Sequence, residues 1–479
     1  MEDFTLVIFG ITGNLAQVKL IPALYDMTAS HLLPEGIQII GTARSPMEKQ
    51  QFRDYIAGVL NKENRHHRHP IEKTIASRLI SRMHYLNGHL DDPAFYEKLN
   101  VQLKKLAGQK QNLIFYLATY PELYEVIFKN IQKSELNTPA KGFTRLMIEK
   151  PIGFNRVSSH RLNQLLLKYF SEKQIFRLDH YLGKEAMQNI LTFRFGNGVF
   201  EPLMHRHFID NIQVMAAEDF GIGGRGGYYD SMGALRDVGQ NHLLQMLALA
   251  TMDAPAQFTN EAVTHERLKI LRSLKPLPGS LVLGQYHGYT QEDKVAPNSE
   301  TNTFFAFQTE IQTPRYGGVP VYIRGGKMLA QWVTEIAITF KNPSNRLFKH
   351  LDCGEEPNVL IYRIQPNEGI VLKILTKMPE HDFKLDVSYM QYCYPQNASA
   401  HAYPDPYVRL LYDAIRGDQT FFNDAGEIDA EWKFIDALAK NSPKPVIYQP
   451  GSWGPKEAGY TIQKSGRCWQ EPSLQFCNF

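Results

Sequence analysis

A short stretch near residue 180 gathers side chains that can bind a phosphate group. Residues 177–185 (RLDHYLGKE) contain six charged or hydrogen-bonding side chains. Among them, His180, Tyr181 and Lys184 offer cationic and hydroxyl donors, which complement phosphate oxygens. A polar crossing between two domains has the same composition, so the residues alone leave both interpretations open.

A second candidate site lies in segment 231–252, whose apolar residues recur with the period of an α-helix. Asp237 and His242 stand in a polar band within it. In an α-helix they lie about 140° apart around the axis, so only a ligand lying across the helix touches both. Histidine titrates near neutrality and is suited to remove a hydroxyl proton as a general base. The alternative is that one of the two faces solvent. Five glycines within residues 221–227 precede this helix and predict irregular backbone.

A nucleotide site is predicted at the start of the chain. An apolar run (4–10) fits a buried strand; Gly10 and Gly13 then mark a turn before an amphipathic stretch and a second apolar run. This is the opening of a parallel α/β unit, in which glycine lets a pyrophosphate approach the helix N-terminus. Because the full three-glycine spacing is absent, a plain tight turn is an equal alternative. Arg44, and no acidic residue, follows the second run, which favours NADP because arginine accommodates its 2′-phosphate.

Two further apolar runs, 112–118 and 144–148, predict more strands of the same sheet. The second runs directly into residues 149–153 (EKPIG), which places Lys150 at the carboxyl end of a parallel strand. Open parallel sheets bind their ligands at that edge. An exposed loop lysine is the competing interpretation.

The second half of the chain predicts a different architecture. Its β-like runs are rich in branched and aromatic residues, and the last two flank a plausible hairpin turn at 366–368. The runs are 303–311, 319–324, 335–341, 358–365 and 369–376. We therefore expect an α/β Rossmann-like dinucleotide-binding domain (residues 1–178) followed by a larger β+α domain with a mostly antiparallel sheet (residues 179–479).

Composition excludes several classes of protein. The 479 residues are 43% hydrophobic and 21% charged with a formal charge of +3, which is typical of a soluble enzyme and gives no basic surface for nucleic acid. The apolar runs are too short to span a membrane. The four cysteines lack metal-ligand spacing and predict a reduced, cytoplasmic protein without structural cross-links or a metal site. The histidines at 66, 67 and 69 are interpreted as part of a solvated loop.

Taken together, these segments resemble the glucose-6-phosphate dehydrogenase family, whose members use NADP. The resemblance extends over essentially the whole chain. RLDHYLGKE is similar to the active-site signature of the family, and GITGNLA from Gly10, EKPIG from Glu149 and RFGNGVFEPL from Arg194 support it. The run EDFGIGGRGGYYDSMGALRDVGQNHLLQML is similar over its full length, as are GDQTFF and YQPGSWGP near the end.

The resemblance implies a role for each candidate residue. His242 would take the proton from the C1 hydroxyl of glucose 6-phosphate, with Asp179 orienting it. The substrate would be bound by Lys150, His180, Tyr181, Lys184, Glu218, Asp237 and Lys327. NADP would be bound by Gly10, Thr12, Gly13, Asn14, Leu15, Arg44 and Lys150. The resemblance also implies a homodimer or a larger homo-oligomer and the first step of the oxidative pentose phosphate pathway.

Some positions depart from the family pattern. Asn14 stands where the family has aspartate, and His89 follows Gly88 where it tends to have aspartate. Gln331 and Trp332 replace a basic residue that the family has four or five positions after the substrate lysine. Loss of that cation predicts weaker substrate binding, by roughly 1–3 kcal/mol. The same departures support one alternative, a catalytically weakened paralogue that acts as a nucleotide-responsive regulatory protein.

Overall fold

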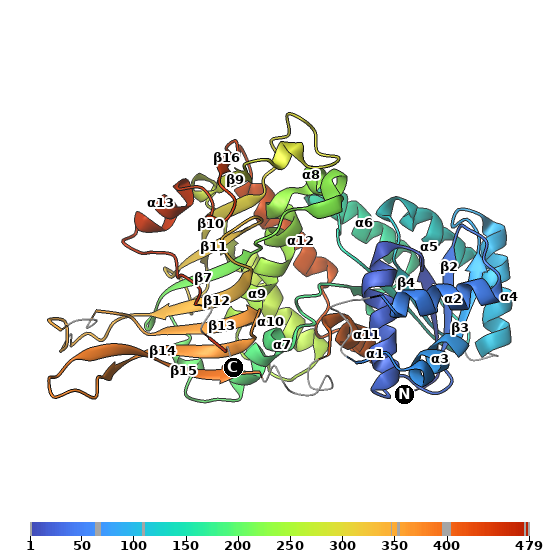
Figure 1. Cartoon of the computed structure of the whole chain (residues 1–479), viewed down its shortest axis with the longest axis horizontal. Helices are drawn as coiled ribbons and strands as arrows, with labels where there is room; N and C mark the ends of the chain where they lie inside the picture. Colours follow the sequence, from blue (N-terminus) through green and yellow to red (C-terminus); the bar gives the residue numbers. More distant parts are fainter. Residues whose placement is uncertain are drawn as a thin grey trace.

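The computed structural model contains two sheets separated by helices (Figure 1). It describes residues 2–62, 69–107, 111–345, 347–351, 355–394, 404–473 and 476–477. His66 and His67 lie outside the described residues, whereas His69 is buried, and its ring nitrogen Nε2 is 3.0 Å from Ser30 Oγ. For His69, the prediction of a solvated loop was therefore wrong. No helix in the described ranges is long and apolar enough to cross a membrane.

The first sheet is parallel, with six strands in the order β3-β2-β1-β4-β5-β6. These strands are β1 (Thr5–Phe9), β2 (Gln38–Ala43), β3 (Met83–Asn87), β4 (Gln111–Leu117), β5 (Gly142–Ile148) and β6 (Ile175–Arg177). Their apolar side chains are buried on both faces, because helices cover both sides of such a sheet. The helices are α1 (Ile21–Ala29), α2 (Lys49–Leu60), α3 (Lys73–Ser81), α4 (Pro93–Ala107), α5 (Tyr124–Lys133) and α6 (Arg156–Tyr169).

The strand order reverses between β1 and β4, which is the point where open α/β sheets bind nucleotides. The predicted strands of this domain and its Rossmann-like class are confirmed.

The second sheet is mixed and mostly antiparallel, as predicted. Its main path runs β15-β14-β13-β12-β7-β11-β10-β9-β16, with β8 (Leu274–Lys275) paired to β10. The predicted runs became β10 (Phe304–Ile311), β11 (Pro320–Gly326), β12 (Val333–Phe340), β13 (Val359–Gln365) and β14 (Gly369–Lys377). Four more strands are β7 (Ile209–Ala217), β9 (Val282–Tyr286), β15 (Leu385–Cys393) and β16 (Val446–Tyr448). The strand β7 inserts between β11 and β12 and runs parallel to β11.

Helices fill the space between the two sheets (Figure 1). They are α7 (Glu185–Phe195), α9 (Leu244–Thr251), α10 (Asn260–Ser273) and α12 (Ala425–Leu438). The helix α11 (Pro406–Arg416) returns to the parallel domain, where Arg145 Nη1 donates hydrogen bonds to the carbonyls of Ala414 and Ile415. The C-terminal part of the chain therefore helps to build the space between the domains.

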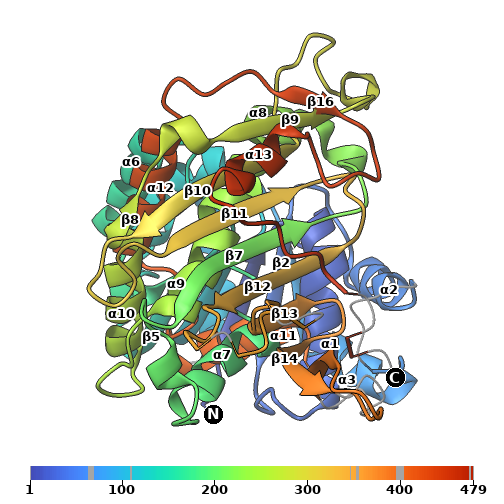
Figure 2. The same ribbon diagram turned by 90° about the vertical axis from the view of Figure 1, so that its left-hand side faces the viewer.

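On its other face, the mixed sheet is crossed by the C-terminal segment that follows α13 (Glu457–Gln463) (Figure 2). Gln213 Nε2 donates to the carbonyl of Cys468, and Arg363 Nη2 donates to that of Ser473. A disulfide joins Cys393 to Cys477, which are 84 positions apart. The prediction of four uncoupled cysteines was therefore wrong; Cys353 lies outside the described residues, and Cys468 is free and exposed.

The segment predicted as one helix from 231 to 252 is divided into parts. It comprises α8 (Gly226–Ala234), the π-helix η6 (Leu235–Leu243) and α9. Gly233, with φ +68°, breaks the helical backbone just before η6. The expectation that residues 221–227 are irregular was only partly right, since Gly223–Arg225 form a 3-10 turn and α8 begins at Gly226.

Candidate active site

The candidate residues meet where the parallel sheet faces the helical layer. Lys150 follows β5, and Asp179, His180 and Tyr181 follow β6, so the carboxyl ends of adjacent strands bring them to one edge. The helix η6 approaches this edge from the other side and supplies Asp237 and His242.

A buried carboxylate and imidazole form the centre of this cluster. His242 Nδ1 lies 2.5 Å from Asp179 Oδ1, and both side chains are 2% exposed. The same carboxylate oxygen accepts the backbone N–H of Tyr181 at 2.9 Å, which fixes its direction. With Nδ1–H donated to Asp179, Nε2 of His242 is left as the proton acceptor.

Opposing influences set the pKa values of this pair. Burial is the largest influence on His242 and lowers its pKa below the usual value; the nearby Lys150 also lowers it, while Asp179 opposes both. Burial would raise the pKa of Asp179, but the charge and hydrogen bond of His242 outweigh it, and the net pKa is lowered. The carboxylate is therefore ionised and the imidazole is neutral near pH 7, as a general base must be.

Lys150 joins the pair to Asp237. Its Nζ lies 2.9 Å from His242 Nε2, 2.9 Å from the backbone carbonyl of Asp237 and 3.3 Å from Asp237 Oδ1. Burial would raise the pKa of Asp237, but Lys150, Lys327 and other cations lower it. Lys150 therefore donates to the lone pair of His242 Nε2. A substrate hydroxyl that gives its proton to His242 would need the same lone pair.

The geometry of η6 corrects one expectation from the sequence. Asp237 and His242 do not point in widely different directions, because both contact Lys150 Nζ. A π-helix forms i→i+5 hydrogen bonds, so residues five apart lie one above the other instead of the 140° apart of an α-helix. The wider turn thus places the two side chains on one face.

The proposed phosphate ligands lie beside the imidazole. The ring of Tyr181 stacks on that of His242 with centroids 4.2 Å apart, and the ring of His180 meets it edge-on at 4.6 Å. Burial and the charges of His242, Lys150 and Lys184 lower the pKa of His180 well below its usual value. Neutral His180 therefore offers one ring N–H, while Lys184 brings the positive charge.

Gln365, at the end of β13, is a contact residue that the sequence reasoning missed. Its amide donates to Tyr181 Oη at 3.2 Å and to Thr334 Oγ1 at 3.1 Å, while its oxygen accepts from Lys184 Nζ at 2.5 Å. The only local signal was its place at the end of a predicted strand, next to Pro366.

Lys327 and Glu218 form an ion pair on the side of the mixed sheet. Lys327 is 2% exposed, and its Nζ lies 5.4 Å from the ring centroid of Tyr229. The charge of Lys327 lowers the pKa of Asp237, and the charge of Glu218 raises the pKa of Tyr181. The ion pair therefore belongs to the same electrostatic environment as the cluster. The structure thus groups all the predicted catalytic and substrate residues.

The predicted cofactor residues lie along the same sheet edge. Gly10 ends β1 with φ +92°, and a Cβ there would lie 2.5 Å from the carbonyl oxygen of Ala118, so only glycine fits. Gly13 N donates to Gly10 O, and Gln17 Nε2 donates to the carbonyl of Thr12. Asn14 and Leu15 form the first helical turn before the π-helix η1 (Ala16–Leu20). Arg44 follows β2; its exposed side chain has no ion-pair partner among the described residues.

Comparison with known proteins agrees with this geometry. The sequence description "Glucose-6-phosphate dehydrogenase, NAD binding domain" matches residues 7–189, and "Glucose-6-phosphate dehydrogenase, C-terminal domain" matches residues 191–470. The chain belongs to the glucose-6-phosphate dehydrogenase family. It is 38% identical to glucose-6-phosphate 1-dehydrogenase of Aggregatibacter actinomycetemcomitans, with 98% of each chain covered, and 37% identical to that of Treponema pallidum, with 98% and 95% covered.

Solved structures of this family have the same fold. A glucose-6-phosphate dehydrogenase in complex with its substrate glucose 6-phosphate is 31% identical, with a TM-score of 0.90 and 98% and 99% of the two chains covered. The enzyme from Mycobacterium avium is 33% identical, with a TM-score of 0.88 and the same coverage. Both comparisons extend over both sheets and the helices between them.

Three of the departures from the family pattern fall outside the residues grouped above. Gln331 and Trp332 precede β12 and are partly buried, and Gln331 Oε1 is a buried acceptor without a donor among the described residues. His89 is exposed in the loop after β3. No departure falls on Asp179, His242 or Lys150.

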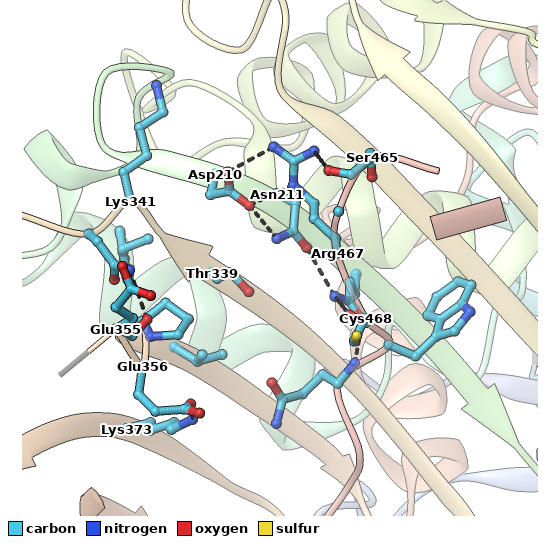
Figure 3. Close-up of a pocket in the computed structure, with 18 of the residues that line it drawn as sticks. Asp210, Asn211, Thr339, Lys341, Glu355, Glu356, Lys373, Ser465, Arg467 and Cys468 are labelled. Carbon is cyan, nitrogen blue, oxygen red and sulfur yellow. Dashed lines mark hydrogen bonds and ion pairs between the residues drawn. The ribbon is translucent and has the colours of Figure 1, made fainter. Parts of the chain in front are cut away.

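A cavity of about 640 Å³ lies elsewhere, between the mixed sheet and the C-terminal segment (Figure 3). Most of its charges are already paired: Arg467 holds Asp210 through contacts of 2.7 and 2.8 Å, and Lys373 Nζ lies 2.6 Å from Glu356. It contains none of the residues grouped above. Size alone therefore does not identify the site of chemistry in this chain.

Proposed function

We propose that this chain oxidises glucose 6-phosphate at C1 to 6-phosphoglucono-1,5-lactone and transfers the hydride to NADP+. The observation that carries the proposal is the arrangement of Asp179, His242 and Lys150 at the ligand-binding edge of a Rossmann-like sheet. A neutral, oriented imidazole beside a cation is suited to remove a hydroxyl proton.

In this proposal, Nε2 of His242 takes the proton of the C1 hydroxyl. Asp179 holds the tautomer through Nδ1 and stabilises the imidazolium that forms. Since Lys150 Nζ lies 2.9 Å from Nε2, the hydroxyl must take its place at that lone pair. Lys150 then stays close through Asp237 and can donate to the substrate oxygen.

The remaining residues fit a phosphorylated sugar. His180, Tyr181 and Lys184 face the 6-phosphate in this proposal, and Gln365 orients two of these groups. Glu218 and Asp237 accept hydrogen bonds from the ring hydroxyls. Lys327 adds a second cation beside Lys150 in this proposal and is paired with Glu218.

The cofactor residues fit a dinucleotide. Gly10 and Gly13 allow the tight turn before the first helix, because a Cβ at either position would meet a backbone oxygen. The N–H groups at the start of that helix are suited to bind a pyrophosphate. The bound nicotinamide supplies the hydride acceptor. Arg44 favours NADP, because its exposed guanidinium follows the second strand, where an arginine accommodates the 2′-phosphate in such domains.

The proposal includes a cytoplasmic homodimer that catalyses the first step of the oxidative pentose phosphate pathway. It also places the boundary between the cofactor domain and the substrate and dimerisation domain near residue 178. We give no weight to a regulatory paralogue, because the departures at Gln331, Trp332 and His89 leave the acid–base pair complete.

The decisive experiment is absorbance at 340 nm with purified protein, glucose 6-phosphate, and NADP+ or NAD+ in parallel. We expect a rise with NADP+ that greatly exceeds the rise with NAD+. Equal rates would keep the chemistry and contradict the role of Arg44. No rise with either cofactor, in protein shown to be folded by circular dichroism, would contradict the proposed reaction.

A further inference from the structure

The helix α12 contacts both segments that carry the proton-transfer groups. It lies between the two sheets, beside α6 (Figure 1). Trp432 Nε1 donates a 3.0 Å hydrogen bond to the carbonyl of Ile152, two residues after Lys150. The preceding residue, Glu431, contacts the helical segment that carries His242. One turn of α12 therefore connects the loop that follows β5 with η6.

Glu431 contacts the segment that carries His242 on both sides of the junction between η6 and α9. Gln240 Nε2 donates to Glu431 Oε2 at 2.9 Å, and Gln245 Nε2 donates to Glu431 Oε1 at 2.7 Å. Gln240 and Gln245 are five residues apart, as are Asp237 and His242. Gln240 lies in η6 and Gln245 in α9, so Glu431 spans the end of the π-helix, whereas Asp237 and His242 both lie within η6 and meet Lys150.

Both contacts of α12 are held rigidly. Glu431 and Trp432 are each 1% exposed, and one turn earlier Glu427 is locked by Arg267 through contacts of 2.8 and 3.1 Å. Arg267 pairs with Glu427, so the hydrogen bonds that Glu431 accepts come from the amides of Gln240 and Gln245. Buried polar groups held in this way fix the relative position of the elements that carry them.

We propose that Glu431 and Trp432 are positioning residues that set the separation between Lys150 and His242. Glu431 fixes η6, which carries the base, and Trp432 fixes the loop that carries the lysine. The proposal rests on the role given above to His242. Neither residue touches the proposed reacting atoms, so both act through the 2.9 Å contact of Lys150 Nζ with His242 Nε2.

The proposal has an electrostatic consequence, and recovery of activity by a conservative variant separates it from a general loosening of the fold. The groups facing His242 are Asp179, His180 and Tyr181 after β6, Lys150 after β5, and Asp237 on η6. Lys150 lowers the pKa of His242, whereas the two aspartates raise it. His242 is held to Asp179 by a contact of 2.5 Å and to Lys150 by a longer one of 2.9 Å. A displacement that lengthens the contact with Lys150 while the hydrogen bond to Asp179 persists weakens the lowering influence, so the pKa of His242 rises.

Four variants test this inference. Trp432→Phe keeps the ring and removes only the hydrogen bond to Ile152, and Glu431→Ala removes both amide contacts. In Glu431→Gln the amide oxygen can still accept from Gln240 Nε2. The amide nitrogen can donate to Gln245 Oε1, which has no donor among the described residues. Lys433→Ala, on the exposed side of the same turn, is the matched control.

We expect Glu431→Ala and Trp432→Phe to lower kcat by roughly 10- to 100-fold, since small displacements of reacting groups have effects of that size. The KM for NADP+ should change less than kcat, because Lys150 is the one proposed cofactor residue on the displaced segments. The acidic limb of the kcat/KM profile should move to higher pH. Glu431→Gln should recover most of the activity, and Lys433→Ala should match the unmodified protein.

A second measurement does not depend on turnover. In protein labelled with carbon-13 at the histidine Cε1, the signal of His242 is identified by its loss in His242→Asn, and its pKa is measured by titration. We expect that pKa to rise in Glu431→Ala and Trp432→Phe. Unchanged kcat and an unchanged His242 pKa in both variants would overturn the inference, as would a loss of activity that only parallels the loss of folded protein. If the unmodified protein lacks activity, the proposed function fails, while the titration still decides this inference.

Discussion

Asp179→Asn isolates the charge of the carboxylate from its hydrogen bonds. One oxygen, Oδ1, accepts both His242 Nδ1–H and the N–H of Tyr181. An amide oxygen placed there preserves both contacts, and the amide nitrogen then takes the place of Oδ2, which accepts no hydrogen bond from the described residues. The tautomer of His242 is therefore retained, and only the charge is lost.

The size of the effect follows from the difference between charged and neutral hydrogen bonds. That difference is about 1–2 kcal/mol, which corresponds to a roughly 5- to 30-fold loss in kcat. His242→Asn removes the base itself and should lose about 10²- to 10⁴-fold while substrate binding persists. Asp179→Asn should therefore be clearly the milder of the two variants.

The loss of the Asp179 charge also shifts the pH dependence of activity in a defined direction. Asp179 raises the pKa of His242 against the lowering caused by burial and Lys150. Without the charge that pKa falls, and because His242 must be neutral to act as a base, the acidic limb of kcat/KM moves to lower pH. The assay is the absorbance at 340 nm from pH 5 to 9 with saturating cofactor. Two results would refute the reasoning. One is a loss of kcat below twofold with no shift of the acidic limb, and the other is a shift of that limb to higher pH.

Three further predictions concern groups outside this pair. Arg44→Ala should raise the KM for NADP+ at least tenfold and leave the rate with NAD+ nearly unchanged, since only the 2′-phosphate loses a charged partner; equal effects on both cofactors would contradict the assignment. Trp332→Arg should lower the KM for glucose 6-phosphate by restoring a cation worth roughly 1–3 kcal/mol, and an unchanged KM would show that the departure is silent. Cys393→Ser should lower the thermal unfolding midpoint, because it removes a cross-link worth about 2–4 kcal/mol. The control Cys468→Ser, at the free cysteine, should leave the midpoint unchanged. Equal midpoints for the two variants would mean that the disulfide does not hold the C-terminal segment.

The local signals in the sequence were sufficient for the elements and for most of the candidate residues. Gly10 predicted its turn because glycine readily adopts a φ of +92°, and this backbone constraint is local. Lys150 was found because it follows an apolar run that ends at the ligand-binding edge of the sheet, whereas the role of Asp179 was implied only by the resemblance of RLDHYLGKE to the family signature. Strand patterns likewise predicted the hairpin between β13 and β14.

Contacts between distant segments left no such signal. The pairing of Cys393 with Cys477 depends on the path of the C-terminal segment over the mixed sheet. Gln365 and Glu431 are ordinary polar residues in their own elements and gain a role only through partners about 180 to 190 positions away in the chain. The π-helix η6 was also missed, because apolar periodicity over a few turns does not distinguish it from an α-helix.

The carboxylate and the helix α12 are expected to act on His242 in opposite directions. Removing the charge of Asp179 leaves burial and Lys150 in place, so the pKa of His242 falls. Removing the hold of Glu431 or Trp432 leaves Asp179 in place and weakens Lys150, so that pKa rises. In the double variant of Asp179→Asn with Trp432→Phe, the two shifts should therefore partly cancel while the losses in kcat combine. A general loosening of the fold would not produce this pattern, because it would expose His242 and move its pKa toward the ordinary value in every variant.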